Sequence, residues 1–322
     1  MRTIAVADVG GTHARFALAQ IENKRVVSLD EPLKLKTADH GSFQLAWEEF
    51  GRRKNVELPS ELALSFAGPV GGEVLKLTNN PWVIRPALMK ERLGVDRFTI
   101  VNDFGAVGFA VATLGDGDFR HVCGPDRPLP SEGVISIVGP GTGLGVAAVL
   151  RKSDHYEIIE TEGGHVDFAP LDTLEDQILV ELRRNFRRVS IERIASGRGL
   201  WNLYEALGAI EGKPVTLRDD KELWAAALEG KDSLANAALD RFCLTLGSVA
   251  GDMALAQGAV AVVIAGGIGL RVADYLPRSG FRDRFIAKGR FERRMDDMSV
   301  KLITYPEPGL FGAAAAFARE HP

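Results

Sequence analysis

The chain has 322 residues, of which 46% are hydrophobic and 25% charged, a composition that excludes a disordered or collagen-like protein. This length exceeds what one hydrophobic core usually supports and predicts about two domains. Lys and Arg number 39 against 43 Asp and Glu, so the net charge of −4 provides no basic excess for binding a nucleic-acid backbone.

Glycine is in clear excess, with 35 residues, about 11% of the chain against a usual value near 7%. The first cluster follows a predicted strand at residues 4–8 and precedes another that begins at Arg15. Gly10, Gly11 and Thr12 therefore form a turn between two strands. Glycines in such a turn let the backbone approach a ligand closely or take a positive φ angle.

Two buried strands are predicted next, at residues 62–66 and 98–101, and the second is followed directly by Asn102 and Asp103. Because α/β sheets bind ligands at the carboxyl ends of their strands, these two residues are candidate site residues. The alternative is a plain structural role, the N-cap of a helix beginning at Phe104.

A second glycine turn, at residues 139–143, stands between predicted strands at 134–138 and 145–150. Aligning Gly10 with Gly141 superposes the two strand–turn–strand units at an offset of 131 residues. Such an offset is expected of an internally duplicated protein with two lobes. Two unrelated hairpins are the alternative.

The rest of the chain is rich in predicted helices. By apolar spacing and length, helices are expected at 173–186, 191–207, 219–228 and 233–257, strands at 260–265 and 300–304, and a last helix at 309–319. The alternation predicts α/β layers around largely covered sheets. We place a small α/β domain at residues 1–112, with a C-terminal helix at about 305–322 packing back on it, and a larger helix-rich α/β domain at residues 113–304.

The first glycine turn has the residue types of a phosphate-binding loop. Glycines let backbone N–H groups close on an anion, the Thr12 hydroxyl adds a donor, and Asp8 can hold Mg²⁺ through water. A tight hairpin turn without a ligand is the alternative.

The second glycine turn repeats glycine at alternate positions and is followed by a strand. Its candidate ligand-binding members are Gly139, Gly141, Thr142 and Gly143. A dinucleotide fingerprint would be followed by a helix, and no Gly-x-x-x-x-Gly-Lys-Ser/Thr run occurs, so neither a Rossmann site nor a P-loop is expected. A third turn follows at Gly266 and Gly267, and this order of three turns is typical of the actin-like ATPase architecture.

Three further segments, Asn102–Ala106, Glu162–Pro170 and Glu192–Gly197, resemble the sugar-site signatures of bacterial glucokinases. Leu77–Trp82 and Tyr305–Ala314 are also similar to that family, so the resemblance spans essentially the whole chain. It implies ATP-dependent phosphorylation of D-glucose at the 6-hydroxyl, with Mg²⁺ as cofactor. It also implies a two-lobed, hexokinase-type actin-like ATPase fold related to ribonuclease H, and a homodimer.

The resemblance also implies a role for each matching residue. Asp103 would be the catalytic base. The sugar ligands would be Asn102, Asp103, Glu162, His165 and Glu192. The Mg-ATP ligands would be Asp8, Gly10, Gly11, Thr12, Gly139, Gly141, Thr142, Gly143, Gly266 and Gly267, with Asp8 holding Mg²⁺ through water.

Two positions depart from the family pattern: His13 stands where Asn is frequent, and Arg198 interrupts a turn usually written Ser-Gly-Pro-Gly. Both leave the candidate chemical residues intact. The zinc motif of the repressor and kinase family is absent from the sequence, and no helix-turn-helix precedes the first glycine turn, which argues against a sugar-responsive repressor.

The residue types suit sugar phosphorylation independently, because a pyranose edge of hydroxyls requires carboxylates, amides and imidazole around it. Plainer roles remain open for several of them. Glu192 follows Ser190 at an expected helix start, where a carboxylate favours the helix dipole, and His165 could be a satisfied loop histidine. Asp167 is interpreted as structural, and the run Asn79–Pro81 as turn chemistry.

Two functional alternatives remain at this point: a kinase for a different hexose on the same fold, and a non-catalytic sugar-binding regulator. A cytoplasmic protein is expected, because only Cys123 and Cys243 occur and the run before Asp8 is too short for a signal peptide. The longest uncharged apolar run, residues 258–270, is too short to cross a bilayer. No membrane or nucleic-acid partner is therefore expected.

Overall fold

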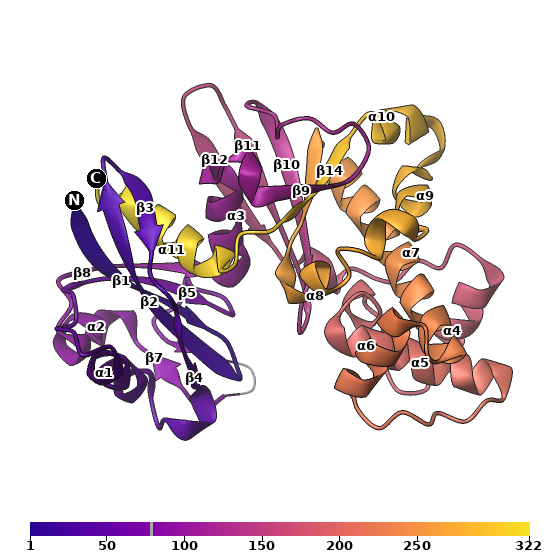
Figure 1. The fold of residues 1–322 in the computed structure, drawn as a ribbon, viewed down its shortest axis with the longest axis horizontal. Coiled ribbons are helices and arrows are strands. Elements are labelled where there is room, and N and C mark those ends of the chain that lie inside the picture. The colour runs from indigo at the N-terminus through magenta and orange to yellow at the C-terminus, as the bar shows by residue number, and fades with distance from the viewer. Residues whose placement is uncertain (78–79) are drawn as a thin grey trace. The chain divides into compact units, whose positions relative to one another are not determined.

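The computed structural model describes residues 1–77 and 80–322. The chain divides into two compact units, each built around a six-stranded sheet (Figure 1). Unit 1 comprises Met1–Leu114 and Tyr305–Pro322, and unit 2 comprises Gly115–Thr304. No helix in the described part of the chain is long and apolar enough to span a membrane.

The sheet of unit 1 has the order β3-β2-β1-β5-β8, with β4 paired to β2. Its strands are β1 (Arg2–Val9), β2 (His13–Glu22), β3 (Arg25–Leu29), β4 (Leu33–Lys36), β5 (Glu61–Phe66) and β8 (Arg97–Asn102). β1 and β2 form an antiparallel hairpin, whereas β1, β5 and β8 run parallel. Every residue of the central strand β5 is buried, as expected where helices cover both faces.

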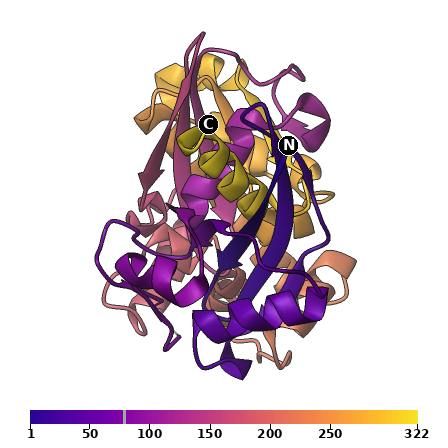
Figure 2. The same cartoon turned by 90° about the vertical axis from the view of Figure 1, so that its left-hand side faces the viewer.

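Alternation along β1 divides the core of unit 1 into two layers. Ala5 and Ala7 face one layer, and Ile4 and Val6 face the other. The first layer is covered by α1 (Phe43–Lys54) and α2 (Pro86–Leu93), with the short 3₁₀ turn η1 (Thr37–Asp39) and the strands β6 (Leu75–Lys76) and β7 (Val83–Ile84) nearby. The second layer is covered by α3 (Asp103–Thr113) and α11 (Pro308–Glu320), the latter drawn in yellow in Figure 2.

The sheet of unit 2 has the order β12-β11-β10-β13-β14-β9. Its strands are β9 (Phe119–Cys123), β10 (Gly133–Pro140), β11 (Leu144–Arg151), β12 (Tyr156–Thr161), β13 (Ala261–Ile264) and β14 (Ser299–Ile303). β10 and β11 form an antiparallel hairpin, and β10, β13 and β14 run parallel. The hairpin and the central parallel strands therefore repeat the arrangement of β1, β2, β5 and β8.

One continuous hydrophobic core lies between this sheet and the helices of unit 2. The helices are α4 (Thr173–Arg183), α5 (Gly197–Glu211), α6 (Asp220–Glu229), α7 (Ser233–Ala256), α8 (Gly266–Arg271), α9 (Phe281–Ile286) and α10 (Glu292–Asp296). Short 3₁₀ turns are η2 (Asp116–Asp118), η3 (Gly163–His165), η4 (Ile191–Arg193), η5 (Leu276–Arg278) and η6 (Gly289–Phe291). The first four helices begin after side-chain caps, namely Asp172, Ser196, Asp219 and Asp232.

The predicted helix at 191–207 is wrong as one element. The chain forms η4, leaves the helical conformation, and restarts as α5, because Ser196 caps the new helix by accepting the Gly199 N–H (3.1 Å). The helix predicted to reach residue 186 ends at Arg183. The other predicted elements of the second half agree with the structure to within one residue at each end.

Candidate functional site

The first glycine turn closes the hairpin of β1 and β2. The Gly10 N–H donates to the carbonyl oxygen of His13 (3.0 Å), and Thr37 Oγ1 donates to the carbonyl oxygen of Gly11 (2.8 Å). The N–H groups of Gly11 and Thr12 have no acceptor among residues 1–77 and 80–322. Two neighbouring backbone donors in such a turn are what an anion engages.

Asp8 lies near the end of β1, and two neighbours fix its carboxylate. Arg15 Nη1, opposite on β2, donates to Oδ2 (3.1 Å), and Ser65 Oγ on β5 donates to Oδ1 (2.8 Å). Arg15 Nε also lies 3.6 Å from a carboxylate oxygen of Glu307. Burial raises the pKa of Glu307, Arg15 opposes that rise, and the charge of Asp8 adds to it. Asp8 is therefore held in one orientation beside the turn.

Asn102 ends β8 and is the N-cap of α3. Its Oδ1 accepts the N–H groups of Phe104 (2.9 Å) and Gly105 (3.2 Å), and its Nδ2 donates to the carbonyl oxygen of Gly68 (3.2 Å). The alternative given for Asn102, the N-cap of a helix, is thus confirmed, and the helix begins at Asp103 rather than at Phe104. Asp103 is the first residue of α3, half-buried, and its Oδ1 also accepts the Phe104 N–H (2.9 Å). The helix dipole stabilises negative charge at this position.

The second glycine turn closes the hairpin of β10 and β11. The Gly141 N–H donates to the carbonyl oxygen of Gly143 (2.8 Å), and the Gly141 carbonyl accepts the N–H of Gly197 at the start of α5 (2.7 Å). Within the described part of the chain, the N–H groups of Thr142 and Gly143 have no acceptor. The turn therefore offers the same kind of backbone donor pair as the first turn.

Leu144, the first residue after the second turn, connects it to both sugar-site segments of unit 2. The Leu144 N–H donates to Glu192 Oε2 (2.9 Å), and the half-buried Glu192 side chain lies so close to Gly143 that a Cβ there would clash with it. The Leu144 carbonyl oxygen occupies the space that a Cβ on Gly164 would need. Glu192 and the segment of Gly164 are thereby fixed to the base of the turn.

The third glycine turn also lies beside the second. Gly266 takes a φ of 78°, and a Cβ on it would clash with the carbonyl oxygen of Pro140. The preceding Ala265 N–H donates to the carbonyl oxygen of Val138 (2.9 Å). The N-terminus of α8, with Gly267 as its second residue, therefore lies against the end of β10.

Glu162 is the N-cap of η3 and His165 is its last residue. Both are exposed, with 77% and 54% of their side chains accessible and 3.9 Å between Glu162 Oε2 and His165 Nε2. Arg188 holds this segment from outside, because its Nη1 donates to the carbonyl oxygen of His165 (2.6 Å) and to Asp167 Oδ1 (2.7 Å). Asp167 therefore has the structural role that the sequence indicated. The side chains of Glu162 and His165 remain accessible to a ligand.

An ionic network closes the far end of this segment. Asp172, the N-cap of α4, accepts from Arg241 (2.5 Å) and from Arg284 (2.6 Å). The almost fully buried Glu175 contacts the same two arginines, at 3.5 Å and 3.1 Å. Because the arginines come from α7 and α9, the network joins the start of α4 to two other helices. The segment that carries Glu162 and His165 is thus fixed at both ends.

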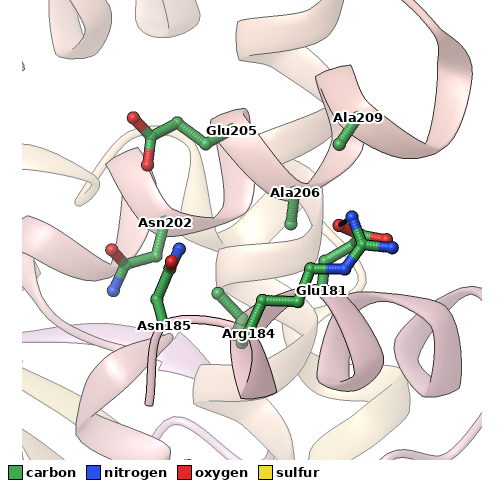
Figure 3. Close-up of a pocket in the computed structure, with 8 residues that line it drawn as sticks. Glu181, Arg184, Asn185, Asn202, Glu205, Ala206 and Ala209 are labelled. Atoms are coloured by element: carbon green, nitrogen blue, oxygen red, sulfur yellow. Dashed lines mark ion pairs between the residues drawn. The ribbon is translucent and has the colours of Figure 1, made fainter.

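A depression of about 400 Å³ between α4 and α5 contains none of the candidate residues. Figure 3 shows Glu181 paired with Arg184, at 2.8 Å, and Glu205 pointing away from that pair. Asn202, which also lines it, donates from Nδ2 to the carbonyl oxygen of Arg193 (2.7 Å). Asn202 therefore braces η4, the turn that carries Glu192.

Sequence reasoning missed the residues that hold the turns in place. Arg15 and Ser65 hold Asp8, Thr37 holds Gly11, and Glu307 pairs with Arg15. All except Arg15, which lies on the adjacent strand of the hairpin, come from distant segments, and no local pattern marks them. Asn80 is a partial exception. Its Oδ1 accepts the Trp82 N–H (2.8 Å), which is the turn chemistry expected of it, while its Nδ2 donates to the Gly11 carbonyl (3.1 Å). Asn79 and Thr78 lie outside the described residues.

The fit to ATP and a metal ion can be tested on these donor sets. Among residues 1–77 and 80–322, no group of three or more His, Cys, Asp or Glu side chains could form an all-protein metal cage. Mg²⁺ in phosphoryl-transfer sites is instead held by one or two carboxylates together with substrate phosphates. One fixed carboxylate, Asp8, beside a turn with open N–H donors fits that type of site.

Comparison with known proteins adds independent findings. The protein-family model described as Glucokinase matches residues 5–320. The chain is 63% identical over 318 residues to a glucokinase of Zymomonas mobilis, covering 99% of this chain and 98% of that protein. It is 39% identical to a glucokinase of Caulobacter vibrioides, covering 98% and 95%. The crystal structure of a glucokinase from an Antarctic psychrotroph superposes with a TM-score of 0.85 and 32% identity over 99% of each chain.

Proposed function

The chain belongs to the glucokinase family, and from this premise we propose that it transfers the γ-phosphoryl group of ATP to the 6-hydroxyl of D-glucose. It is a glucose-phosphorylating enzyme with the actin-like ATPase fold of the sugar kinases. The observation that carries this conclusion is 63% identity over nearly the whole length of a glucokinase.

We assign sugar binding to Asn102, Asp103, Glu162, His165 and Glu192. Each sugar hydroxyl both donates and accepts, and this set offers carboxylates that accept, an amide that does both, and an imidazole that does either. A buried partner left unpaired by a wrong sugar costs about 1–3 kcal/mol, which is enough to reject an epimer. The accessible side chains of Glu162 and His165 support the assignment.

Asp103 is proposed as the base. Its carboxylate accepts the proton of the 6-hydroxyl while that oxygen bonds to the γ-phosphorus, and the bond from this phosphorus to the departing ADP oxygen breaks. An ordinary Asp is a weak base at neutral pH. It suffices because phosphoryl transfer has a loose transition state, so the proton leaves late and positioning provides most of the acceleration.

The glycine turns are proposed to hold the phosphates of ATP. Gly10, Gly11 and Thr12 in unit 1, and Gly139, Gly141, Thr142 and Gly143 in unit 2, supply the two turns. Their open N–H groups support this role because backbone donors bind phosphate oxygens without needing a charged side chain. Gly266 and Gly267 would add the N-terminus of α8 to the second turn.

Mg²⁺ is proposed to bind through water to Asp8, and when bound it neutralises charge on the β- and γ-phosphates. Asp8 can do this because Arg15 and Ser65 fix its carboxylate without occupying all of its lone pairs. Arg15 in turn places a positive charge close to the phosphate-binding turn.

A homodimer and a cytoplasmic location are the finer parts of this proposal. The dimer rests on the resemblance to the family, and sedimentation equilibrium would measure it directly. The location rests on the proposed donor, since ATP is an intracellular metabolite, and cell fractionation would measure it.

An ADP-release assay coupled to NADH oxidation, run over a panel of hexoses, tests the function. We expect glucose to support the highest kcat/KM and the product to be phosphorylated at oxygen 6 by ³¹P and ¹³C NMR. A kinase for a different hexose would shift the preference to another sugar. A non-catalytic regulator would bind sugar and release no sugar-dependent ADP.

A further inference from the structure

Four basic residues share one face of the unit 1 sheet beside the first glycine turn. In the antiparallel pair of β2 and β4, His13 stands opposite Lys36 and Arg15 stands opposite Lys34. Directly opposed residues of a strand pair point to the same face. The residues between them, such as Ala14 and Leu35, face the core instead. We call His13, Arg15, Lys34 and Lys36 the cationic strip.

The strip carries three full positive charges, and two carboxylates, Asp8 and Glu307, lie beside it. Arg15 is paired with Asp8 and Glu307, whereas Lys34 and Lys36 are exposed and form no ion pair with any residue in 1–77 or 80–322. Two basic residues directly opposite each other destabilise a strand pair. Glu307 offsets part of the repulsion between Arg15 and Lys34, because its carboxylate interacts with the charges of both residues. The strip keeps a positive excess that a bound anion would neutralise.

The strip leads directly into the phosphate-binding turn. Lys36 is the last residue of β4, and the next residue, Thr37, ties the chain to the turn through its N–H, which donates to the Thr12 carbonyl (3.1 Å). Its hydroxyl donates to Gly11 as well. The open N–H groups of Gly11 and Thr12 therefore lie beside the end of β4 that carries the exposed Lys36.

His13 reports the positive potential of the strip. Burial, followed by the charges of Lys34, Arg15 and Lys36, lowers the pKa of His13 below 6.5. At neutral pH its imidazole is therefore uncharged and can donate one hydrogen bond. The strip as a whole keeps two unpaired lysine charges.

We propose that the cationic strip extends the first glycine turn into a binding surface for the polyphosphate tail of the phosphoryl donor, with Lys34 and Lys36 as donor-specific residues. This inference rests on the proposed kinase function. The ligand class is a linear polyphosphate, so inorganic tripolyphosphate binds the same surface and competes with MgATP.

The test uses a double variant that carries both Lys34→Gln and Lys36→Gln. The control is the single variant Lys90→Gln. Lys90 is an exposed lysine of α2, on the opposite layer of the same unit, so its replacement removes a charge outside the strip. Neither variant changes a residue assigned to the sugar site, to Mg²⁺ or to the glycine turns. We expect the double variant to raise KM for MgATP about three- to tenfold, with kcat and KM for glucose unchanged. Its KM should also depend less on salt, because fewer exposed charges are screened.

Tripolyphosphate binding, measured by calorimetry on each purified variant, provides a readout that does not need activity. We expect the double variant to bind tripolyphosphate several-fold more weakly than Lys90→Gln does. Equal KM values for MgATP and equal tripolyphosphate affinities in the two variants would contradict the proposal that the cationic strip binds polyphosphate. Absence of sugar phosphorylation by the unmodified protein would overturn the proposed function instead, and the calorimetry would still decide whether the strip binds polyphosphate.

Discussion

The two glycine turns share a sequence pattern but are stabilised in different ways. In unit 1 the strand pair beside the turn is Asp8 with Arg15, a pair of opposite charges. In unit 2 the pair at the same distance from the turn, one step inside Pro140 and Leu144, is Gly139 with Gly145. The first hairpin thus carries two charges one residue pair from the turn, whereas the second has no side chains at that pair. In the second hairpin the backbone at and beside the turn is approached closely by α5, α8 and η3.

Unit 2 places its buried charge elsewhere. The network of Asp172, Glu175, Arg241 and Arg284 lies at the end of the sugar-site segment rather than at the turn. Similar turns are therefore stabilised by different means: a fixed carboxylate in unit 1, and close backbone packing with a distant ionic network in unit 2. Duplicated patterns in a sequence do not imply duplicated chemistry.

The largest expected effect distinguishes the proposed catalytic carboxylate of unit 1, Asp103, from a structural carboxylate of unit 2, Asp167. Asp103→Asn should lower kcat about 10²- to 10⁴-fold, because the amide cannot accept the hydroxyl proton. The fold should survive, since the amide oxygen can still accept the Phe104 N–H. The coupled ADP assay and a thermal melt measure the two quantities.

The matched control is Asp167→Asn, which changes an exposed carboxylate that pairs with Arg188. It should reduce kcat less than about tenfold, because an exposed pair contributes little to the position of the segment. If Asp103→Asn keeps near-full turnover, Asp103 is not the base, and the proposal that unit 1 supplies the catalytic carboxylate must be abandoned.

The second prediction tests the close packing of the turn in unit 2. A Cβ on Gly141 meets nothing within 4 Å among the described residues, so Gly141→Ala should fold normally. It should nevertheless raise KM for MgATP about tenfold, because the methyl group occupies space needed by a phosphate. Gly143→Ala instead displaces the Glu192 carboxylate from the Leu144 N–H and should raise KM for both glucose and MgATP.

Initial rates over a grid of glucose and MgATP concentrations separate the two KM values. A Gly141→Ala enzyme with an unchanged KM for MgATP would show that no phosphate approaches this turn. A Gly143→Ala enzyme whose KM for glucose stays constant would remove Glu192 from the proposed sugar site.

Much of the fold could be predicted because long periodic segments determine it locally. The helix expected at 233–257 agrees with α7 to within one residue at its end, since apolar spacing over about seven turns leaves little ambiguity. The helix expected at 191–207 failed because its interruption depends on a cap at Ser196 and on hydrogen bonds to the turn at Gly141. The cap is a local contact and the contact with Gly141 comes from a distant segment, but helical periodicity reveals neither of them.

The candidate site shows the same limit. Glycines, Asp8 and Asn102 were visible because each belongs to a short motif. Their supports were not, because Ser65 and Glu307 reach Asp8 or its partner across 57 or more residues of chain. Glu192 was predicted as a sugar ligand or as a carboxylate at a helix start. Its contact with Leu144 depends on the pairing of β10 with β11, which brings the turn beside η4.

The smallest expected effect tests the ionic network of unit 2, which lies away from the glycine turn, through its carboxylate Asp172. Burial alone would raise the pKa of Asp172, but the Glu175 N–H together with Arg241 and Arg284 lowers it below 3.8. A carboxyl whose pKa is lower in the folded than in the unfolded protein stabilises the fold at any pH above its unfolded pKa. This stability is lost as the pH falls through the folded pKa. Asp172→Asn should therefore cost about 1 kcal/mol near neutral pH, at the low end because the carboxyl is partly exposed.

Thermal melts of the wild type and Asp172→Asn, compared from pH 6 to pH 3, measure this contribution. The difference in Tm should be a few degrees at pH 6 and should shrink below pH 3.8, where protonation removes the charge that the substitution removes. Asp176→Asn, an exposed acid in the same helical turn, should show a smaller difference. A Tm difference for Asp172→Asn that is independent of pH would mean that Asp172 stabilises α4 only as a cap, because capping by an amide or a carboxylate does not require the arginines.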